Sequence, residues 1–232
     1  MHLWCLFGIK FALPYIMKKL FSLLFVCVSL LVNAQDQDPK AKTVLDDLSK
    51  TTKSYKTITA DYNFTILNKE KKPVEKQAGK VQIKGNKFKL DIPGNTIVCD
   101  GTTLWNYSKD AKEVTIKTFD GDNQDQLNTS KIFTIYESGY KFKYDKEEKV
   151  GAVNCHVIDL YPSVKPEKKK FHTVKIYVDK TKKQVVKLVM LMKDGGQNVY
   201  DIKTLKPNLE IADVVFVFDT KGFKPDQISD ER

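Results

Sequence analysis

The stretch GKVQIKGNKFKLDIPGNTIVCDGTTLWNYSKDAKEVTIK, residues 79–117, decides the fold class of this chain. Apolar residues alternate with polar ones, many of them lysines, and the alternation is interrupted at Pro93-Gly94-Asn95 and at Asp100-Gly101. Alternation of period two is typical of antiparallel strands that bury one face. Gly, Asn and Asp tolerate the backbone of tight turns. The apolar positions of the first two strands are Val81, Ile83, Phe88, Leu90 and Ile92.

The same alternation continues on both sides of this stretch. Upstream, one face of a strand holds Ile58, Ala60, Tyr62, Phe64 and Ile66. Downstream we expect strands over residues 140–144, 153–161, 171–178, 185–192, 199–205 and 214–218. The segment 185–192 is apolar on both faces, so we expect it to be covered on both sides.

Two helices are expected. Asp38 followed by Pro39 is typical of a helix start, and apolar residues recur at helical spacing to about Lys53. A second, short helix is expected over residues 128–138, with Gly139 ending it. The apolar stripe of this helix consists of Ile132, Phe133, Ile135 and Tyr136.

The N-terminal region has the pattern of a secretory signal peptide. Met17-Lys18-Lys19 precedes an apolar run over residues 20–32, and Val32-Asn33-Ala34 forms a small-residue exit. The run is shorter than the ~20 apolar residues that span a bilayer, which argues against a retained anchor. We therefore expect residues 1–16 to precede the true start, cleavage after Ala34, and one exported domain over residues 35–232.

The net charge of +10 comes almost wholly from lysine, since Arg232 is the only arginine. Nucleic-acid readers favour arginine for bidentate and stacking contacts. Lysines spread over the polar faces of strands instead discourage edge-to-edge aggregation. We therefore expect no nucleic-acid partner.

Cys99 and Cys155 are the two cysteines that remain after cleavage. An exported protein can form a disulfide, and closing this loop could contribute ~4 kcal/mol. Both cysteines could equally be small buried hydrophobes, and both alternatives stay open here. With no C-x-x-C motif, and with His156 and His172 as the only histidines after residue 34, we expect no metal site.

No sequence motif of catalysis is present. The chain has no G-x-S-x-G, H-E-x-x-H, P-loop or G-x-G-x-x-G pattern. We therefore expect no catalytic residues, no cofactor and no enzymatic activity.

Several segments in order resemble one family. They are residues 55–64, residues 84–89 through the D-G-x-x-L-W-x-Y motif at 100–107, residues 128–138, and residues 216–218 with the tail 222–232. Together they resemble the periplasmic outer-membrane lipoprotein carrier family (LolA). The resemblance implies a mainly β (α+β) fold, a half-open antiparallel β-barrel with an N-terminal helix and inserted lid helices over an apolar cavity.

The resemblance also implies a function. The family carries lipoprotein acyl chains through the periplasm, from an inner-membrane lipoprotein-releasing ABC transporter to the outer membrane. We expect a monomeric carrier with these partners, and leave open whether an outer-membrane receptor also takes part. A different lipid-binding role on the same fold, such as an envelope sensor, and a secreted hydrolase are the alternatives.

Alternation and resemblance together give candidate site residues. The expected cavity lining is Tyr62, Phe64, Val81, Ile83, Phe88, Leu90 and Trp105, where Trp105 rests on the family pattern alone. The expected lid residues are Ile132, Phe133, Ile135 and Tyr136. Many family members have an arginine where this chain has Gly85, so we expect apolar contacts to hold the lid and its opening to depend weakly on salt.

Overall fold

The computed structural model describes residues 38–120, 133–137 and 139–232, and residues 37–232 form one compact unit. One α-helix, short 3-10 helices and a twelve-stranded sheet make up the described part. Within the described residues, no helix combines the length and apolar character needed to cross a membrane.

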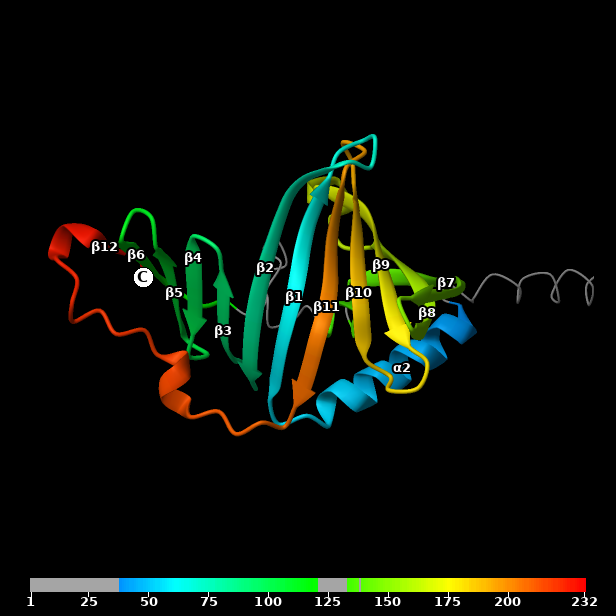
Figure 1. Cartoon of the computed structure of the whole chain (residues 1–232), viewed down its shortest axis with the longest axis horizontal. Helices are drawn as coiled ribbons and strands as arrows, with labels where there is room; N and C mark the ends of the chain where they lie inside the picture. The colour runs from blue at the N-terminus through cyan, green and yellow to red at the C-terminus, as the bar shows by residue number, and fades with distance from the viewer. Residues whose placement is uncertain (1–37, 121–132, 138) are drawn as a thin grey trace, which may run out of the picture. The chain divides into compact units, whose positions relative to one another are not determined.

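The sheet is antiparallel except at one edge, where the last strand runs parallel to its neighbour. Its strands are β1 (Ile58–Leu67), β2 (Pro73–Lys84), β3 (Lys87–Ile92), β4 (Asn95–Cys99), β5 (Thr103–Ser108), β6 (Glu113–Thr118), β7 (Tyr140–Val150), β8 (Val153–Pro162), β9 (Phe171–Asp179), β10 (Val185–Met192), β11 (Gln197–Pro207) and β12 (Ile228–Asp230). Their order is β12-β6-β5-β4-β3-β2-β1-β11-β10-β9-β8-β7, so the sheet is open (Figure 1). The expected mainly β, unclosed fold is confirmed.

The N-terminal helix α2 (Pro39–Lys53) is confirmed with its expected cap. The Asp38 carboxylate accepts the backbone N–H groups of Lys40 and Ala41 at 2.8 and 3.2 Å. Its other oxygen accepts the backbone N–H of Tyr144 at 3.0 Å, which ties the start of α2 to β7. Four residues at helical spacing, Ala41, Val44, Leu45 and Leu48, are buried.

Strand β7 is longer than expected because its second half has no apolar alternation. The register with β8 shifts between Tyr144 and Lys146, and the strand continues through charged residues to Val150. The described part of the expected mid-chain helix contains only the short 3-10 helix η2 (Ile135–Glu137). Gly139 follows with the positive φ of 79° expected at that position.

The expected strand over residues 214–218 is wrong. The structure has a 3-10 helix there, η4 (Asp213–Phe216). Val214 is 75% exposed although Phe216 is fully buried, so these residues do not share a strand face. Asp213 instead binds Lys84 and Lys87 at 2.7 and 2.9 Å, which fastens η4 to the β2–β3 hairpin. The terminal strand is β12.

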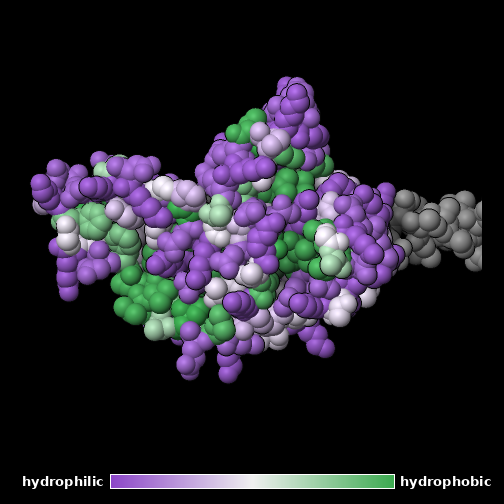
Figure 2. Space-filling model, in the orientation of Figure 1, coloured by the Kyte–Doolittle hydropathy of each residue, from purple (hydrophilic) through white to green (hydrophobic). Residues whose placement is uncertain are grey.

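The C-terminal segment covers part of the sheet and leaves apolar surface of its own. The Tyr107 ring contacts Phe218 and Phe223, with centroids 5.4 and 5.5 Å apart. Val214 and Val217 remain exposed, and Figure 2 shows apolar atoms gathered near η4, at the lower left of the view. The short apolar run at residues 214–218 of the C-terminal segment therefore packs against the protein on one side only.

The main hydrophobic cluster lies on one face of the sheet together with α2, and we call this the inner face. Register places Ile83, Phe88, Cys99 and Leu104 next to one another across β2 to β5 on this face. A second cluster on the opposite face of β8 to β11 consists of Cys155, Val157, Tyr177, Val189 and Val199. Strand β10 contributes to both clusters, so the expectation that it is buried on both faces is confirmed.

Candidate lipid-binding site

The inner face carries more apolar side chains than its helix covers. Helix α2 lies at the β7–β10 end of the sheet (Figure 1) and contacts β7. On β11 and β1 to β5, several apolar side chains that pack against the same cluster are only partly buried. These include Phe64, Ile92, Ile97, Leu104, Tyr200 and Ile202. An incompletely covered apolar face of this kind can accept hydrocarbon, because each withdrawn CH₂ contributes ~0.8 kcal/mol.

Six of the seven expected lining residues lie together on the inner face. All six belong to the main cluster, and they are Tyr62, Phe64, Val81, Ile83, Phe88 and Leu90. Tyr200 lies among them, and its ring centroid is 4.7 Å from that of Phe64 and 6.2 Å from that of Tyr62. Sequence analysis missed Tyr200, although the alternation of strand 199–205 was the signal that could have found it.

Trp105 lies on the other face of the sheet. It is paired with Val98 on β4 and Ile116 on β6, whereas its neighbour Leu104 is paired with Cys99 on the inner face. Since successive side chains of a strand point to opposite faces, Trp105 is removed from the expected lining. The family motif locates the strand correctly but does not fix which of its residues face inward.

The segment 133–137 packs on the inner face and on α2. Phe133 and Tyr136 are 2% and 5% exposed and belong to the main cluster. Tyr136 lies against Ser49 and Thr52 of α2, while Glu137 accepts a hydrogen bond from Ser49 at 2.6 Å and pairs with Lys53 at 3.0 Å. Sequence analysis missed Glu137, which directly follows the expected stripe. Ile132 and the side chain of Ile135 lie outside the described residues.

Gly85 stands in the turn between β2 and β3 and has a positive φ. Its φ is +58° and no atom lies within 4 Å of the Cβ it lacks. The adjacent Lys84 instead donates to the backbone oxygen of Ile211 at 3.1 Å and to Asp213. Lys84 therefore holds the C-terminal segment.

Four tyrosines that belong to the main cluster or pack against it have raised pKa values. Burial raises the pKa of Tyr62 to about 12, with a smaller contribution from Tyr200, and burial alone raises the pKa of Tyr200 to about 12. Burial also raises the pKa of Tyr136 and of Tyr140. These phenols stay neutral at ordinary pH, so they add hydrogen-bonding capacity to the face without adding charge.

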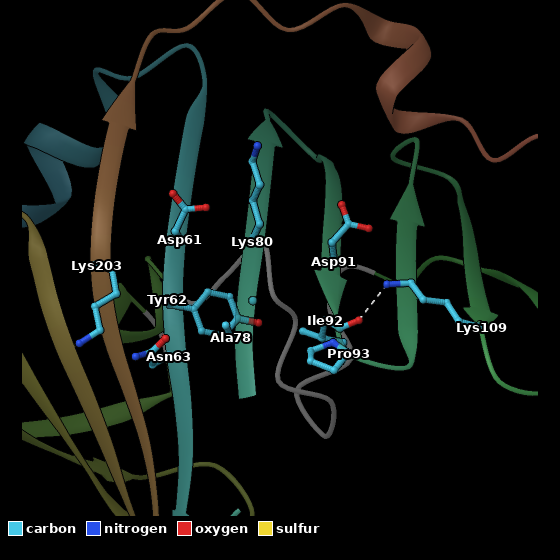
Figure 3. A pocket seen from close by; sticks show the side chains of 11 residues that line it. Asp61, Tyr62, Asn63, Ala78, Lys80, Asp91, Ile92, Pro93, Lys109 and Lys203 are labelled. Atoms are coloured by element: carbon cyan, nitrogen blue, oxygen red, sulfur yellow. Dashed lines mark hydrogen bonds between the residues drawn. The ribbon is translucent and has the colours of Figure 1, made fainter. Parts of the chain in front are cut away.

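A groove opens where β2 and β3 separate. It encloses about 390 Å³ and is lined by residues of β1, β2, the end of β3 and the following turn. Figure 3 shows Tyr62 between β1 and β2, Ile92 and Pro93 on the far side, and Lys109 reaching across. Lys109 donates to the backbone oxygen of Ile92 at 3.0 Å. Tyr62 belongs to the main cluster and Ile92 packs against it, so the groove borders the inner face at these two residues. The lining residues Asp61, Lys80 and Asp91 lie on the opposite face of the sheet.

Within the described residues, the two cysteines, Cys99 and Cys155, are free and buried. Cys99 lies in the inner cluster and Cys155 in the cluster on the opposite face. Burial raises the pKa of each thiol to about 11. Of the two alternatives, a disulfide or two small buried hydrophobic residues, the structure has the second.

The two histidines of the described residues, His156 and His172, have partners on the sheet. His156 Nδ1 is 3.0 Å from the Tyr144 hydroxyl, and His172 Nδ1 is 2.8 Å from the Thr173 hydroxyl. Burial lowers the pKa of His156. In the parts of the chain that the structure describes, no group of three or more His, Cys, Asp or Glu residues could hold a metal ion.

Comparison of the sequence with known proteins gives matches over most of the chain. Residues 53–219 match the family model described as outer membrane lipoprotein carrier protein LolA. An outer-membrane lipoprotein carrier protein of Pasteurella multocida is 27% identical over 176 residues, covering 73% of this chain and 80% of that protein. The uncharacterized protein MJ0687 of Methanocaldococcus jannaschii is 26% identical over 205 residues, covering 87% of this chain. The chain spans only 58% of the length of MJ0687.

A solved structure has a similar fold. An uncharacterized conserved protein from Thermus thermophilus aligns with a TM-score of 0.56 and 13% identity, covering 83% of this chain and 99% of that one. At this identity the likeness bears on the fold alone.

Proposed function

The chain belongs to the LolA family of outer membrane lipoprotein carrier proteins, and on that premise we propose that it is a soluble periplasmic carrier of lipoproteins. It takes acyl chains released by an inner-membrane ABC transporter, shields them on the inner face, and delivers them to the outer membrane. It does so without catalysis, through differential affinity for the acyl chains.

One observation carries this proposal. On the inner face, apolar side chains run from β1 to β5, and those of Phe64, Ile92, Ile97 and Leu104 are only partly buried. A 16-carbon chain withdrawn from water gains on the order of 10 kcal/mol. A face of this kind can hold such a chain, and the neutral phenols of Tyr62 and Tyr200 can reach the ester or amide groups at its head.

The contacts of segment 133–137 support the proposal that it acts as a lid. Phe133 and Tyr136 occupy apolar surface that an acyl chain would otherwise contact, so cargo and segment compete for the inner face. The role of Ile132 and Ile135 in the same lid remains a prediction from their apolar stripe.

The experiment is to purify the exported protein, extract it with organic solvent and identify the extracted lipids by mass spectrometry. Co-purified lipoprotein, together with displacement of a fluorescent fatty acid by that lipoprotein, is the expected result. An intact fold that binds no fatty acid would contradict the proposal. N-terminal sequencing of the same sample tests the expected cleavage after Ala34 and hence the periplasmic location.

A second function on the same fold is favoured by one observation. Gly85 lacks the side chain that many family members use to hold the lid, and Lys84 is engaged with Asp213. A protein with a weaker lid could bind a different lipid and report on it as an envelope sensor. Extraction of glycolipid or phospholipid in place of lipoprotein would favour this alternative.

A further inference from the structure

Strand β2 extends well beyond its neighbour β3. The two strands pair only from Lys80 opposite Asp91 to Lys84 opposite Lys87. Residues 73–79 of β2 pair with β1 on one side, and no described strand pairs with them on the other. The sheet therefore contains an unpaired strand edge in its middle (Figure 1), which we call the β2 edge.

The backbone groups that the β2 edge presents follow from the hairpin register. Lys84 and Lys87 flank a two-residue turn and so form a hydrogen-bonded pair. Alternation along β2 then directs the N–H and C=O groups of Ala78 and Lys76 away from β1. Both residues are exposed, so these groups are available to a partner.

The β2 edge borders the groove of Figure 3. Ala78 and Gly79 form one wall, and Ile92 and Pro93 form the other. Gly79 has no side chain because the Tyr62 ring lies against it: a Cβ there would be 2.5 Å from Tyr62 Cζ. The groove thus lies beside the unpaired backbone of β2 and shares Tyr62 and Ile92 with the inner cluster.

The charges beside the groove favour a ligand without excess positive charge. The groove is lined by three lysines, Lys80, Lys109 and Lys203, and by two aspartates, Asp61 and Asp91, so its lining carries a formal net charge of +1. Carboxylates and neutral polar side chains therefore suit this site better than lysines.

We propose that the β2 edge binds the N-terminal peptide segment of the acylated cargo as an added antiparallel or parallel strand. This inference rests on the proposed carrier function. The acyl chains occupy the inner face, and the residues that follow the acylated cysteine leave through the groove and pair with Lys76 and Ala78. An extended backbone is the ligand that satisfies alternating donors and acceptors of a strand edge.

The β2 edge is suited to one short segment. Pro73 has no N–H, and the register with β1 shifts between Ile66 and Leu67, so regular pairing ends there. The exposed Lys76 and Pro73 also discourage long strands of a second copy from adding to the same edge.

The test compares three probes on the full exported protein. They are palmitate, a triacylated cysteine without a peptide, and the same triacylated cysteine followed by eight neutral residues (Ser-Ser-Asn-Ala-Thr-Ser-Asn-Ala). We expect the peptide to increase the affinity about tenfold over the acylated cysteine alone. N-methylation of alternate peptide residues should abolish this gain for one set of positions and preserve it for the other, since only one set faces β2.

Protein variants and amide exchange complete the test. Ala78→Pro removes an outward N–H and should remove the tenfold gain while leaving palmitate binding unchanged; the control Ala78→Val keeps the N–H and should keep the gain. Hydrogen exchange at Lys76 and Ala78 should slow with the lipopeptide and not with palmitate.

Three outcomes would overturn the inference: no gain from the peptide, equal losses for both sets of N-methyl groups, or slow exchange at Lys76 and Ala78 in the free protein, which would mean that the edge is already paired. If no acylated probe binds, the carrier function fails instead. In that case, hydrogen exchange at the Lys76 and Ala78 amides is measured with the unacylated peptide at millimolar concentration. Slower exchange would support strand addition at the β2 edge, and unchanged exchange would overturn it.

Discussion

The Glu137 carboxylate accepts a hydrogen bond from the Ser49 hydroxyl at 2.6 Å, across 88 positions of the sequence. Lys53 of the same helix adds an ion pair at 3.0 Å. Beside this polar contact, Tyr136 and Phe133 pack into the inner cluster. The segment before β7 is therefore held by both polar and apolar contacts. The apolar stripe alone predicts that opening of the lid depends only weakly on salt.

We expect Glu137→Ala to lower the free energy of unfolding by ~1 kcal/mol, since Lys53 is 64% exposed and surface pairs contribute little. The variant should also bind palmitate more tightly, because opening becomes easier. Chemical denaturation and fatty-acid titration at low and high salt measure both effects. Glu137→Gln keeps an acceptor for Ser49 and is the control. If Glu137→Ala has wild-type stability and affinity, the contacts of Glu137 with Ser49 and Lys53 do not hold the segment closed.

Phe133→Ala should lower the free energy of unfolding by ~3 kcal/mol or more, because Phe133 is 2% exposed. The affinity for palmitate should fall much less, or rise, since the side chain competes with cargo for the inner face. Denaturation and titration of the same samples compare the two changes, with Phe133→Leu as a milder control. An affinity that falls in step with stability would mean that Phe133 supports the site rather than covering it.

Gly79→Ala tests the contact between Gly79 and Tyr62. Alanine usually stabilises a strand relative to glycine by ~0.5–1 kcal/mol. Here the added methyl would lie 2.5 Å from the Tyr62 ring, so we expect a loss of ~1–3 kcal/mol. In a Tyr62→Ala background the same change should be neutral or stabilising, and additive losses in the double variant would contradict the contact.

The two thiols should be inert in the folded protein. Burial raises the pKa of Cys99 and of Cys155 to about 11, so little thiolate is present at pH 8. A small disulfide reagent should titrate two thiols in denaturant and react at least 100-fold more slowly with the native protein cleaved after Ala34. Because the pKa of each thiol is raised in the folded state, the buried neutral thiols contribute to the free energy of unfolding below pH 9. This contribution is lost as the pH rises through 11. Fewer than two thiols in denaturant would indicate a disulfide.

Local patterns predict most of the strands and α2. Alternation identifies the inward residues of β1 to β3, and Asp38 marks the start of α2 because its carboxylate caps the helix. Alternation fails in β7, where the shift near Asp145 and a charged run hide the strand. It also misleads at Val214, where the apolar residues belong to a 3-10 helix and pair with no strand of the described sheet.

Long-range relations cannot be predicted from local patterns. Strand β1 pairs with β11, and nothing within either segment indicates the other. The face on which Trp105 lies depends on the register between β4 and β5, and the latch of Glu137 on Ser49 depends on where α2 crosses the sheet. Such features depend on how segments distant in the sequence pack together. The candidate site is built from such segments, so its details could not be predicted from local patterns.

The most direct measurement of the central claim is photolabelling of the exported protein with a diazirine analogue of palmitate, followed by mass spectrometric mapping of the labelled residues. We predict that labels concentrate on inner-face residues such as Phe64, Ile92 and Tyr200, and that excess lipoprotein removes them. Labels on the opposite face around Val189, or an absence of displaceable labelling in a folded protein, would show that the inner face is an ordinary packed core.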